Sequence, residues 1–363
     1  MKLEDAIDFN PTEKLTKNTY AKKIGMDKLS PFYKYIDSFE YEKYSGGAKF
    51  INGDTIVARI TPCLENGKTA YIDLLDDGEI AFGSTEFIVL RAKEGITLSE
   101  YIYYLAISPW FRNKAISLMT GTSGRQRVQI DPLKLEDHNI PSISEQKKIL
   151  RLLSNIDSKI KLNNEINNNL YEEAVALYKD KFKGIGQGKK TIGDYIVPKR
   201  GKNLLTRDAI DGDTPVVAGG IAPSAYHNQF NTKSPVITIS ASGANAGYTN
   251  LWNIPVWASD CSYIDDSITK NVYFWYVVLK TRQNEIFDAQ TGSAQPHIYP
   301  QHIAEMGIGE LNIAEVDKYN NLVTPLFKMI GENQKENKKL SELRDTLLPK
   351  LMNGEIDLDN IEI

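Results

Sequence analysis

The chain has 363 residues, of which 41% are hydrophobic and 25% charged, which is typical of folded domains and excludes a disordered or fibrous chain. The longest uncharged apolar run, at 272–279, is far shorter than the roughly 20 residues that cross a bilayer, and acids stand near the amino terminus where a signal peptide would be basic. Two cysteines, Cys63 and Cys261, support neither a disulfide framework nor a thiolate metal site, so we expect a cytoplasmic protein.

The net charge of −4 does not by itself favour a nucleic-acid partner, because contacts to phosphates need clustered Lys and Arg. If the protein binds DNA, it must use local basic patches, or a partner subunit must supply much of the attraction to phosphate.

Predicted elements follow one another in the same order twice along the chain. The first series has a strand and glycine-bearing turn at 55–72, the string IAFGSTEF at 80–87, an aromatic-rich helix at 101–111 and a TG loop at 120. The second series has the corresponding features at 235–249, 256–263, 272–279 and 291. This repetition indicates a mixed α/β (α+β) protein with two related globular domains.

A long helix with a heptad pattern follows each series. The two helices align at a constant offset of 170 residues, with apolar or Asn side chains at alternating steps of four and three. Asparagines occupy the same central layers in both helices, at Asn163, Asn167, Asn333 and Asn337. We expect these residues to set the register of the helices at some cost in stability. Arg344 is the one residue that suits the apolar seam poorly.

The ends of the helices have recognisable signals. Ser142 and Glu145 match a capping box, which predicts that the first helix starts there, and it should stop at Gly184 before a flexible linker. The second helix has Pro325 near its expected start, with 315–322 as a separate turn or a kinked extension, and it should end around 349–354.

The apolar stripes of two such long helices must bury each other. An antiparallel pair is favoured, because a parallel pair would need the linker and second domain to span the whole helix. The expected organisation is a first domain at 1–141, a spacer helix at 142–184, a linker and second domain at 185–311, and a second spacer helix with a tail at 312–363. The two halves would be related by a pseudo-two-fold axis, with an antiparallel coiled coil between the globular domains.

Two similar heads on a rigid spacer suit a target with two half-sites at fixed separation, as duplex DNA provides. The alternative is a scaffold, without DNA, that holds two protein partners a fixed distance apart. Periodicity alone does not choose between these two functions.

Five strings in the chain resemble one known family. They read NGDTIVARITPCLENGKTAYI at 52–72, FGSTEFIVLRA at 82–92, GTSGRQRV at 121–128, IPSISEQKKI at 140–149 and ELRDTLLPKLMNGEI at 342–356. In them the chain resembles the specificity (S) subunit of type I restriction-modification systems, over nearly its whole length. The resemblance implies two target recognition domains that each read one half of a bipartite double-stranded DNA sequence, and helices that dock two methyltransferase subunits. It also implies restriction subunits in the full complex.

The candidate DNA contacts are basic, amide or hydroxyl side chains near glycine-bearing loops. In the first domain they are Arg59, Lys68, Arg125, Gln126 and Arg127; in the second they are Lys199, Arg200, Lys202, Arg207, His227, Ser242, Asn245 and His297. Such groups can grip phosphates or form paired hydrogen bonds with base edges. The plainer interpretation is a solvated loop held by an ion pair, ordinary turn chemistry, or a structural histidine. Because the second TG loop, TGSAQPHI, lacks the RQR of the first, the two heads should read different bases.

The sequence carries no motif for chemistry that we could find. It has no nucleotide-binding P-loop, no glycine-rich fingerprint for a methyl donor, and no metal-ligand spacing. We therefore expect no catalytic residues, metal or cofactor, and a fused enzyme is disfavoured. The aromatic residues Tyr101, Tyr104, Trp110 and Phe111, and likewise 273–276, are expected in the core.

Overall fold

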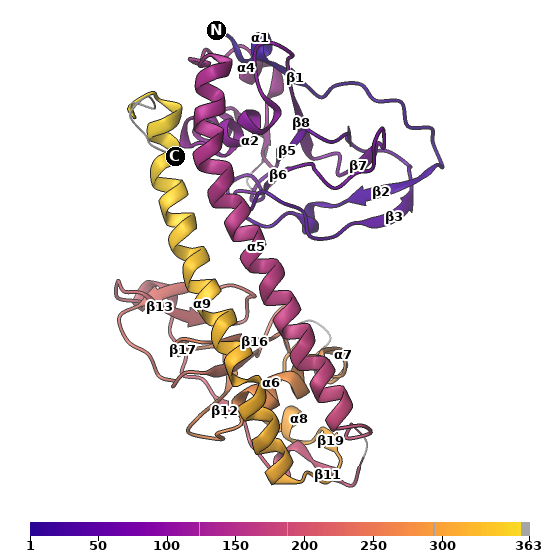
Figure 1. The fold of residues 1–363 in the computed structure, drawn as a ribbon, viewed down its shortest axis with the longest axis vertical. Helices are drawn as coiled ribbons and strands as arrows, with labels where there is room; N and C mark the ends of the chain where they lie inside the picture. Colours follow the sequence, from indigo (N-terminus) through magenta and orange to yellow (C-terminus); the bar gives the residue numbers. More distant parts are fainter. Residues whose placement is uncertain (123, 187, 293–294, 357–363) are drawn as a thin grey trace. The chain divides into compact units, whose positions relative to one another are not determined.

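The computed structural model describes residues 1–122, 124–186, 188–292 and 295–356 (Figure 1). The chain divides into two compact units: unit 1 is Met1–Leu162 with Asn337–Ile363, and unit 2 is Asn163–Glu336. The two long helices, α5 (Ile143–Lys181) and α9 (Ile313–Met352), each contribute one half to each unit. Strands and helices are both abundant, so the mixed α/β class is confirmed. Among the described residues, we find no helix with the length and apolar character that a membrane crossing requires.

Unit 1 contains two four-stranded sheets. One has the order β1-β8-β5-β6, all antiparallel; the other has the order β3-β2-β7-β4, in which β2 and β7 are parallel. The strands of these sheets are β1 (Ile7–Phe9), β2 (Tyr20–Ile24), β3 (Glu40–Lys43), β4 (Lys49–Phe50), β5 (Thr55–Ala58), β6 (Thr69–Tyr71), β7 (Ala81–Gly83) and β8 (Phe87–Ala92). The remaining elements are β9 (Met119–Thr120) and β10 (Arg127–Val128), which form a ribbon, helices α1 (Leu3–Ala6), α2 (Ser99–Ile107), α3 (Pro109–Ser117) and α4 (Ile130–Lys134), and the 3₁₀ helix η1 (Met26–Lys28).

Unit 2 has sheets of the same design. One has the order β12-β18-β15-β16, and the other has the order β14-β13-β17, in which β13 and β17 are parallel. The strands are β12 (Lys199–Arg200), β13 (Thr214–Val217), β14 (Ala225–His227), β15 (Val236–Ser240), β16 (Thr249–Trp252), β17 (Trp257–Ala258) and β18 (Cys261–Asp265), with β11 (Lys190–Thr191) and β19 (Gly307–Ile308) as a separate pair. The helices are α6 (Val272–Thr281), α7 (Gln283–Asp288) and α8 (Pro300–Ala304), with the 3₁₀ helices η2 (Ile192–Asp194) and η3 (Thr206–Asp208).

The strand pairings give a residue-by-residue correspondence between the two units. The backbone N–H of Arg59 donates to the Glu86 carbonyl in unit 1, and that of Ala241 donates to the Asp260 carbonyl in unit 2. Arg59 therefore corresponds to Ala241, and β5 and β8 correspond to β15 and β18. The repeat seen in the sequence is therefore a repeat of sheet topology.

Aromatic helices fill the cores of both units, as predicted. Tyr101, Tyr104 and Phe111 are buried in unit 1, where Trp110 packs against the core in a partly buried position. Residues 273–275 are buried in unit 2, and Tyr276 packs against them. These side chains cover one sheet of each unit and join it to the long helices.

In each unit the two helix halves lie side by side in antiparallel directions (Figure 1). In unit 1, Asp157 pairs with Arg344, while Ile149, nearer the start of α5, shares a cluster with Met352, nearer the end of α9. In unit 2, Asn167 accepts a hydrogen bond from Asn333 at 2.8 Å, and further along α5 the carbonyl of Ala174 accepts one from Tyr319 at 2.7 Å.

Pro325 lies inside α9, and 315–322 form part of this helix rather than a separate turn, which was one of the two arrangements expected. The helix runs without a break from Ile313 because Val316, Tyr319 and Val323 are buried at helical spacing before the proline. Pro325 itself is exposed, so its ring lies toward solvent. The hydroxyl of Thr324 donates to the carbonyl of Asn320 at 2.7 Å, one turn earlier. Packing on the buried face thus outweighs the missing N–H of the proline.

Amide side chains attach the helices to the domains. Gln146, fully buried in the first turn of α5, accepts a hydrogen bond from the Leu98 N–H at 2.8 Å and donates to the carbonyls of Ile96 and Pro141, both at 2.9 Å. Asn320 of α9 accepts from the Phe274 N–H at 3.1 Å and donates to the Lys270 carbonyl at 3.3 Å. Each amide thus holds the chain at the start of an aromatic helix, α2 or α6.

Candidate DNA-binding surfaces

Arg127 of the first TG loop is held by a carboxylate. β10 pairs Arg127 with Thr120, and the guanidinium donates to both oxygens of Glu86 at 2.7–3.0 Å. These bonds hold the pKa of Glu86 below its usual 4.5. Glu86 lies at the corner between β7 and β8, a position that sequence reasoning did not single out. For Arg127, the ion pair of the plainer interpretation is therefore present.

The other residues of this loop differ in their exposure. Arg125 is exposed, and its guanidinium has no ion-pair partner among the described residues. Gln126 is half-buried, and its backbone exchanges hydrogen bonds with the backbone N–H and the side-chain hydroxyl of Thr61, both at 3.0 Å. Arg125 is thus the side chain that this loop presents to solvent most freely.

Lys68 and Arg59 lie behind the loop and are half-buried. The Lys68 ammonium donates to the Met26 carbonyl at 2.8 Å, so it holds the turn at 62–68 against η1. The Arg59 guanidinium donates to the Val128 carbonyl at 3.3 Å. Neither cation forms an ion pair within hydrogen-bond distance among the described residues.

In unit 2, the corner carboxylate is Asp260, between β17 and β18. It accepts hydrogen bonds from Arg200 of β12 and from the Ser242 hydroxyl. Lys199 donates to Ser267 at 3.3 Å. Lys202 is exposed, and Arg207 is exposed beside Asp208. The predicted basic cluster is therefore split between a paired arginine and solvent-exposed cations.

His227 is 5% exposed and does not present an edge to solvent. Its Nδ1 accepts a hydrogen bond from the Ile210 N–H at 3.0 Å, and its ring lies edge-on to Trp257. Side chains alternate along β14, so the preceding Tyr226 is the exposed one. We therefore leave His227 out of the candidate surface.

His297 corresponds to Arg127. It pairs with Thr291 as Arg127 pairs with Thr120, and its Nδ1 lies 2.7 Å from the Gln295 carbonyl oxygen. His297 and Asn245 are both half-buried. The two TG loops thus hold a guanidinium in unit 1 and an imidazole in unit 2 at the same place.

Asparagines expected to set the helix register form hydrogen bonds between α5 and α9. Besides the Asn167–Asn333 hydrogen bond, the buried Asn163 donates to Glu336 at 2.7 Å. Asn337 is half-buried at the start of the α9 segment of unit 1. Among the described residues, we find no cluster of three or more His, Cys, Asp or Glu that could hold a metal ion.

Comparison with known proteins shows which family the chain is similar to. Residues 1–172 match the family described as "Type I restriction modification DNA specificity domain". The specificity subunit of the type I restriction enzyme MjaIX of Methanocaldococcus jannaschii is 27% identical over 314 residues, covering 74% of this chain and 71% of the relative. The putative type I specificity subunit S.MpnORF638P of Mycoplasma pneumoniae is 25% identical over 341 residues, covering 86% of this chain and 88% of the relative.

The chain is similar to type I specificity subunits over most of its length. A crystal structure of the type I restriction-modification S subunit from M. genitalium has the same fold, with a TM-score of 0.51 and 20% identity, covering 97% of this chain and 95% of that one.

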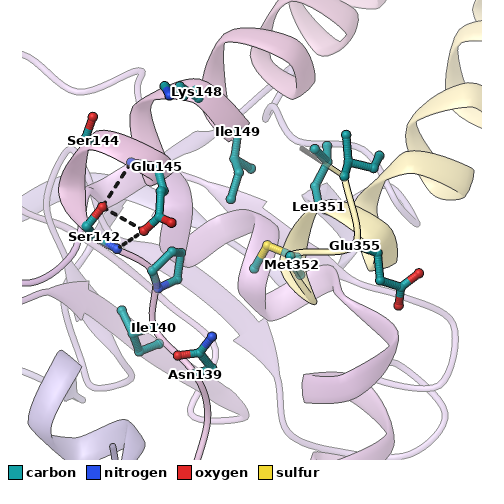
Figure 2. A pocket seen from close by; sticks show the side chains of 13 residues that line it. Asn139, Ile140, Ser142, Ser144, Glu145, Lys148, Ile149, Leu351, Met352 and Glu355 are labelled. Carbon is teal, nitrogen blue, oxygen red and sulfur yellow. Dashed lines mark hydrogen bonds between the residues drawn. The ribbon is translucent and has the colours of Figure 1, made fainter. Parts of the chain in front are cut away.

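The two strings most specific for the S-subunit family meet in unit 1. IPSISEQKKI begins α5 and LLPKLMNGEI ends α9, and together they line a groove of about 800 Å³ (Figure 2). Figure 2 shows the capping box at one side of the groove, where Glu145 accepts from the Ser142 N–H at 2.8 Å and from its hydroxyl at 2.7 Å. Leu351 and Met352 lie on the opposite side. The strings on which the resemblance rests therefore build the junction of the two helices.

Proposed function

We propose that the protein is the DNA sequence-specificity subunit of a type I restriction-modification complex, and that its two heads, at 1–141 and 185–311, read the two halves of a bipartite target. One observation carries this proposal: the heads share a sheet topology but differ at corresponding positions near their loops. Arg59 and Arg127 of the first head correspond to Ala241 and His297 of the second. A shared frame with exchanged side chains suits two readers of different sequences.

Exposed cations are the best candidates for phosphate contacts. Arg125 in the first head and Lys199, Lys202 and Arg207 in the second are exposed, and none of them is buried in an ion pair. Arg127 and Arg200 are held by carboxylates and are better suited to reading bases in a fixed orientation, because a paired guanidinium keeps its geometry. Gln126, Ser242, Asn245 and His297 lie beside them and supply further polar groups.

The spacer helices at 142–184 and 312–363 would form an antiparallel coiled coil that relates the heads by a pseudo-two-fold axis and sets the gap between half-sites. The antiparallel contacts inside each unit support this arrangement. The helices would also dock two methyltransferase subunits, with restriction subunits completing the complex. The chain itself would perform no chemistry, and the methyltransferase would act on a base turned out of the duplex.

Selection from a random pool of duplex DNA tests the proposal. The full chain is mixed with its methyltransferase subunit, and bound DNA is recovered at several salt concentrations. We expect one bipartite sequence to be enriched, with affinity falling as salt rises. Binding that is absent, or enrichment of no sequence, contradicts the proposal and favours a protein scaffold.

Exchange of one head provides the control. Replacing residues 191–311 with the second head of another S subunit should change one half-site and leave the other as it was. A change in both half-sites contradicts separate reading by the two heads.

A further inference from the structure

Two arginines of unit 1, Arg59 and Arg127, lie near the single carboxylate of Glu86. The Arg127 guanidinium donates to both carboxylate oxygens of Glu86. Arg59 lies opposite Glu86, and its backbone N–H donates to the backbone carbonyl of Glu86 at 2.9 Å. The Arg59 side chain reaches the Val128 carbonyl at 3.3 Å, and its Nε is shielded from solvent with no acceptor among the described residues. One positive charge is thus left without a carboxylate of its own, and a buried N–H without an acceptor is costly.

The Arg59 side chain lines a cavity of about 390 Å³ in unit 1. Lys49 is the other charged residue in its wall, and no Asp or Glu is among the lining residues. The Lys49 ammonium donates to the backbone carbonyl of Glu13. Thr12, Thr85 and Asn10 are the other polar residues of the wall. A hollow with two cations, two hydroxyls and no carboxylate is suited to an anion.

Unit 2 does not repeat this arrangement. The residue that corresponds to Arg59 is Ala241, which is buried. The corner carboxylate there, Asp260, pairs with one arginine, Arg200, so the charges balance. The surplus cation is therefore a property of the first head alone.

We propose that this cavity of the first head binds one phosphodiester group of the DNA backbone, with Arg59 as the charged donor and Lys49 beside it. The proposal rests on the proposed function, since it takes duplex DNA as the ligand. The anion would pair with the Arg59 guanidinium, which no carboxylate holds, and would give its remaining N–H groups acceptors. Arg127, already engaged by Glu86, would not make this contact.

The test compares R59M with the wild-type chain, each as the full chain with its methyltransferase subunit, on the duplex enriched by the selection described above. Affinity is measured across salt concentrations. Loss of one phosphate contact should weaken binding about tenfold and lower the slope of log affinity against log salt by about 0.9, without changing the selected sequence. The matched control is K114M, which removes one positive charge from a surface pair with Glu136 in the same unit and should leave the slope unchanged.

R59K separates the role of the charge from that of the guanidinium, and a thermal unfolding curve detects a variant that fails to fold. Lysine retains the charge, so R59K should preserve the salt slope and most of the affinity. An unchanged slope in R59M overturns the phosphate site, and so does a change of the selected base in R59K, which would mean that Arg59 reads a base. If R59M unfolds at a lower temperature than the wild type, the salt slopes of R59K and R59Q are compared instead. A lower slope in R59Q than in R59K supports the phosphate site, and equal slopes overturn it. If the wild type selects no sequence, the proposed function fails before this comparison begins.

Discussion

One layer of side chains between the two long helices is ionic in unit 1, and the corresponding layer is apolar in unit 2. In unit 1 the layer holds Asp157 of α5 and Arg344 of α9, joined at 2.9 Å, and both side chains are almost fully buried. The residues at an offset of 170 in unit 2 are Phe327 of α9 and Ala174 of α5, both buried. The aromatic helix follows suit: the Tyr104 hydroxyl donates to Asp157 at 2.7 Å, whereas the Tyr276 ring contacts the Phe327 ring edge-on.

This difference shows that the repeat preserves position rather than interaction. The same three places, one on each long helix and one on the aromatic helix, hold a buried ionic network in unit 1 and an apolar cluster in unit 2. Each solution is complete in itself, because a buried charge needs its partner and an aromatic ring needs packing. A change to one member of a layer should therefore cost far more than an exchange of the whole layer.

The largest effect is expected from R344A, which places in unit 1 the alanine that unit 2 has at the corresponding position, Ala174, and leaves Asp157 unchanged. Asp157 would remain buried without its counter-charge, so unit 1 should lose about 3–5 kcal/mol of stability. Urea unfolding followed by the fluorescence of the chain measures the loss.

The companion variant D157F/R344A transplants the whole layer of unit 2. It should recover most of the stability that R344A loses, because an apolar layer of similar volume replaces a buried ion pair with little cost. A double variant as unstable as R344A would mean that the two layers are not interchangeable.

An intermediate effect is expected at the polar layer of unit 2. N333A leaves Asn167 without its hydrogen-bond partner and should cost about 1 kcal/mol, whereas N167L/N333L should be neutral or stabilising, as for an apolar coiled-coil layer. Unfolding midpoints of the two variants provide the measurement. Equal losses in both would indicate that the Asn pair stabilises the helices rather than specifying their register.

The smallest effect is expected at the corner carboxylate of unit 1. Arg127 lowers the pKa of Glu86 in the folded chain, so the pair stabilises unit 1 above the usual pKa of 4.5 and loses its contribution as pH falls through the lowered value. R127M should therefore shift the unfolding midpoint slightly at pH 7 and by less at pH 3, because pH 3 lies below the usual pKa of Glu86. A shift of the same size at both pH values would point to lost packing instead of lost charge.

The sequence predicted what depends on local order. The capping box at Ser142, the aromatic cores and the repeated series all follow from patterns within a few residues. It did not predict the use of Arg344, because the partner that explains this residue lies on the other long helix. Likewise, it did not single out Glu86, whose carboxylate holds Arg127 from the turn between β7 and β8. His227 follows a glycine turn, yet strand alternation in β14 turns it inward.

The attachment of the helices to the heads has one more consequence. Among the described residues, the side-chain amides of Gln146 and Asn320 bond to peptide groups, at 96–98 and Pro141 for the first and at 270–274 for the second. Peptide groups are the same in every sequence, so a head can diverge in almost all its side chains, or be traded for one from a distant lineage, and still offer these amides the same partners. Exchange of a whole head, with the two long helices unchanged, would then be enough to produce a new specificity.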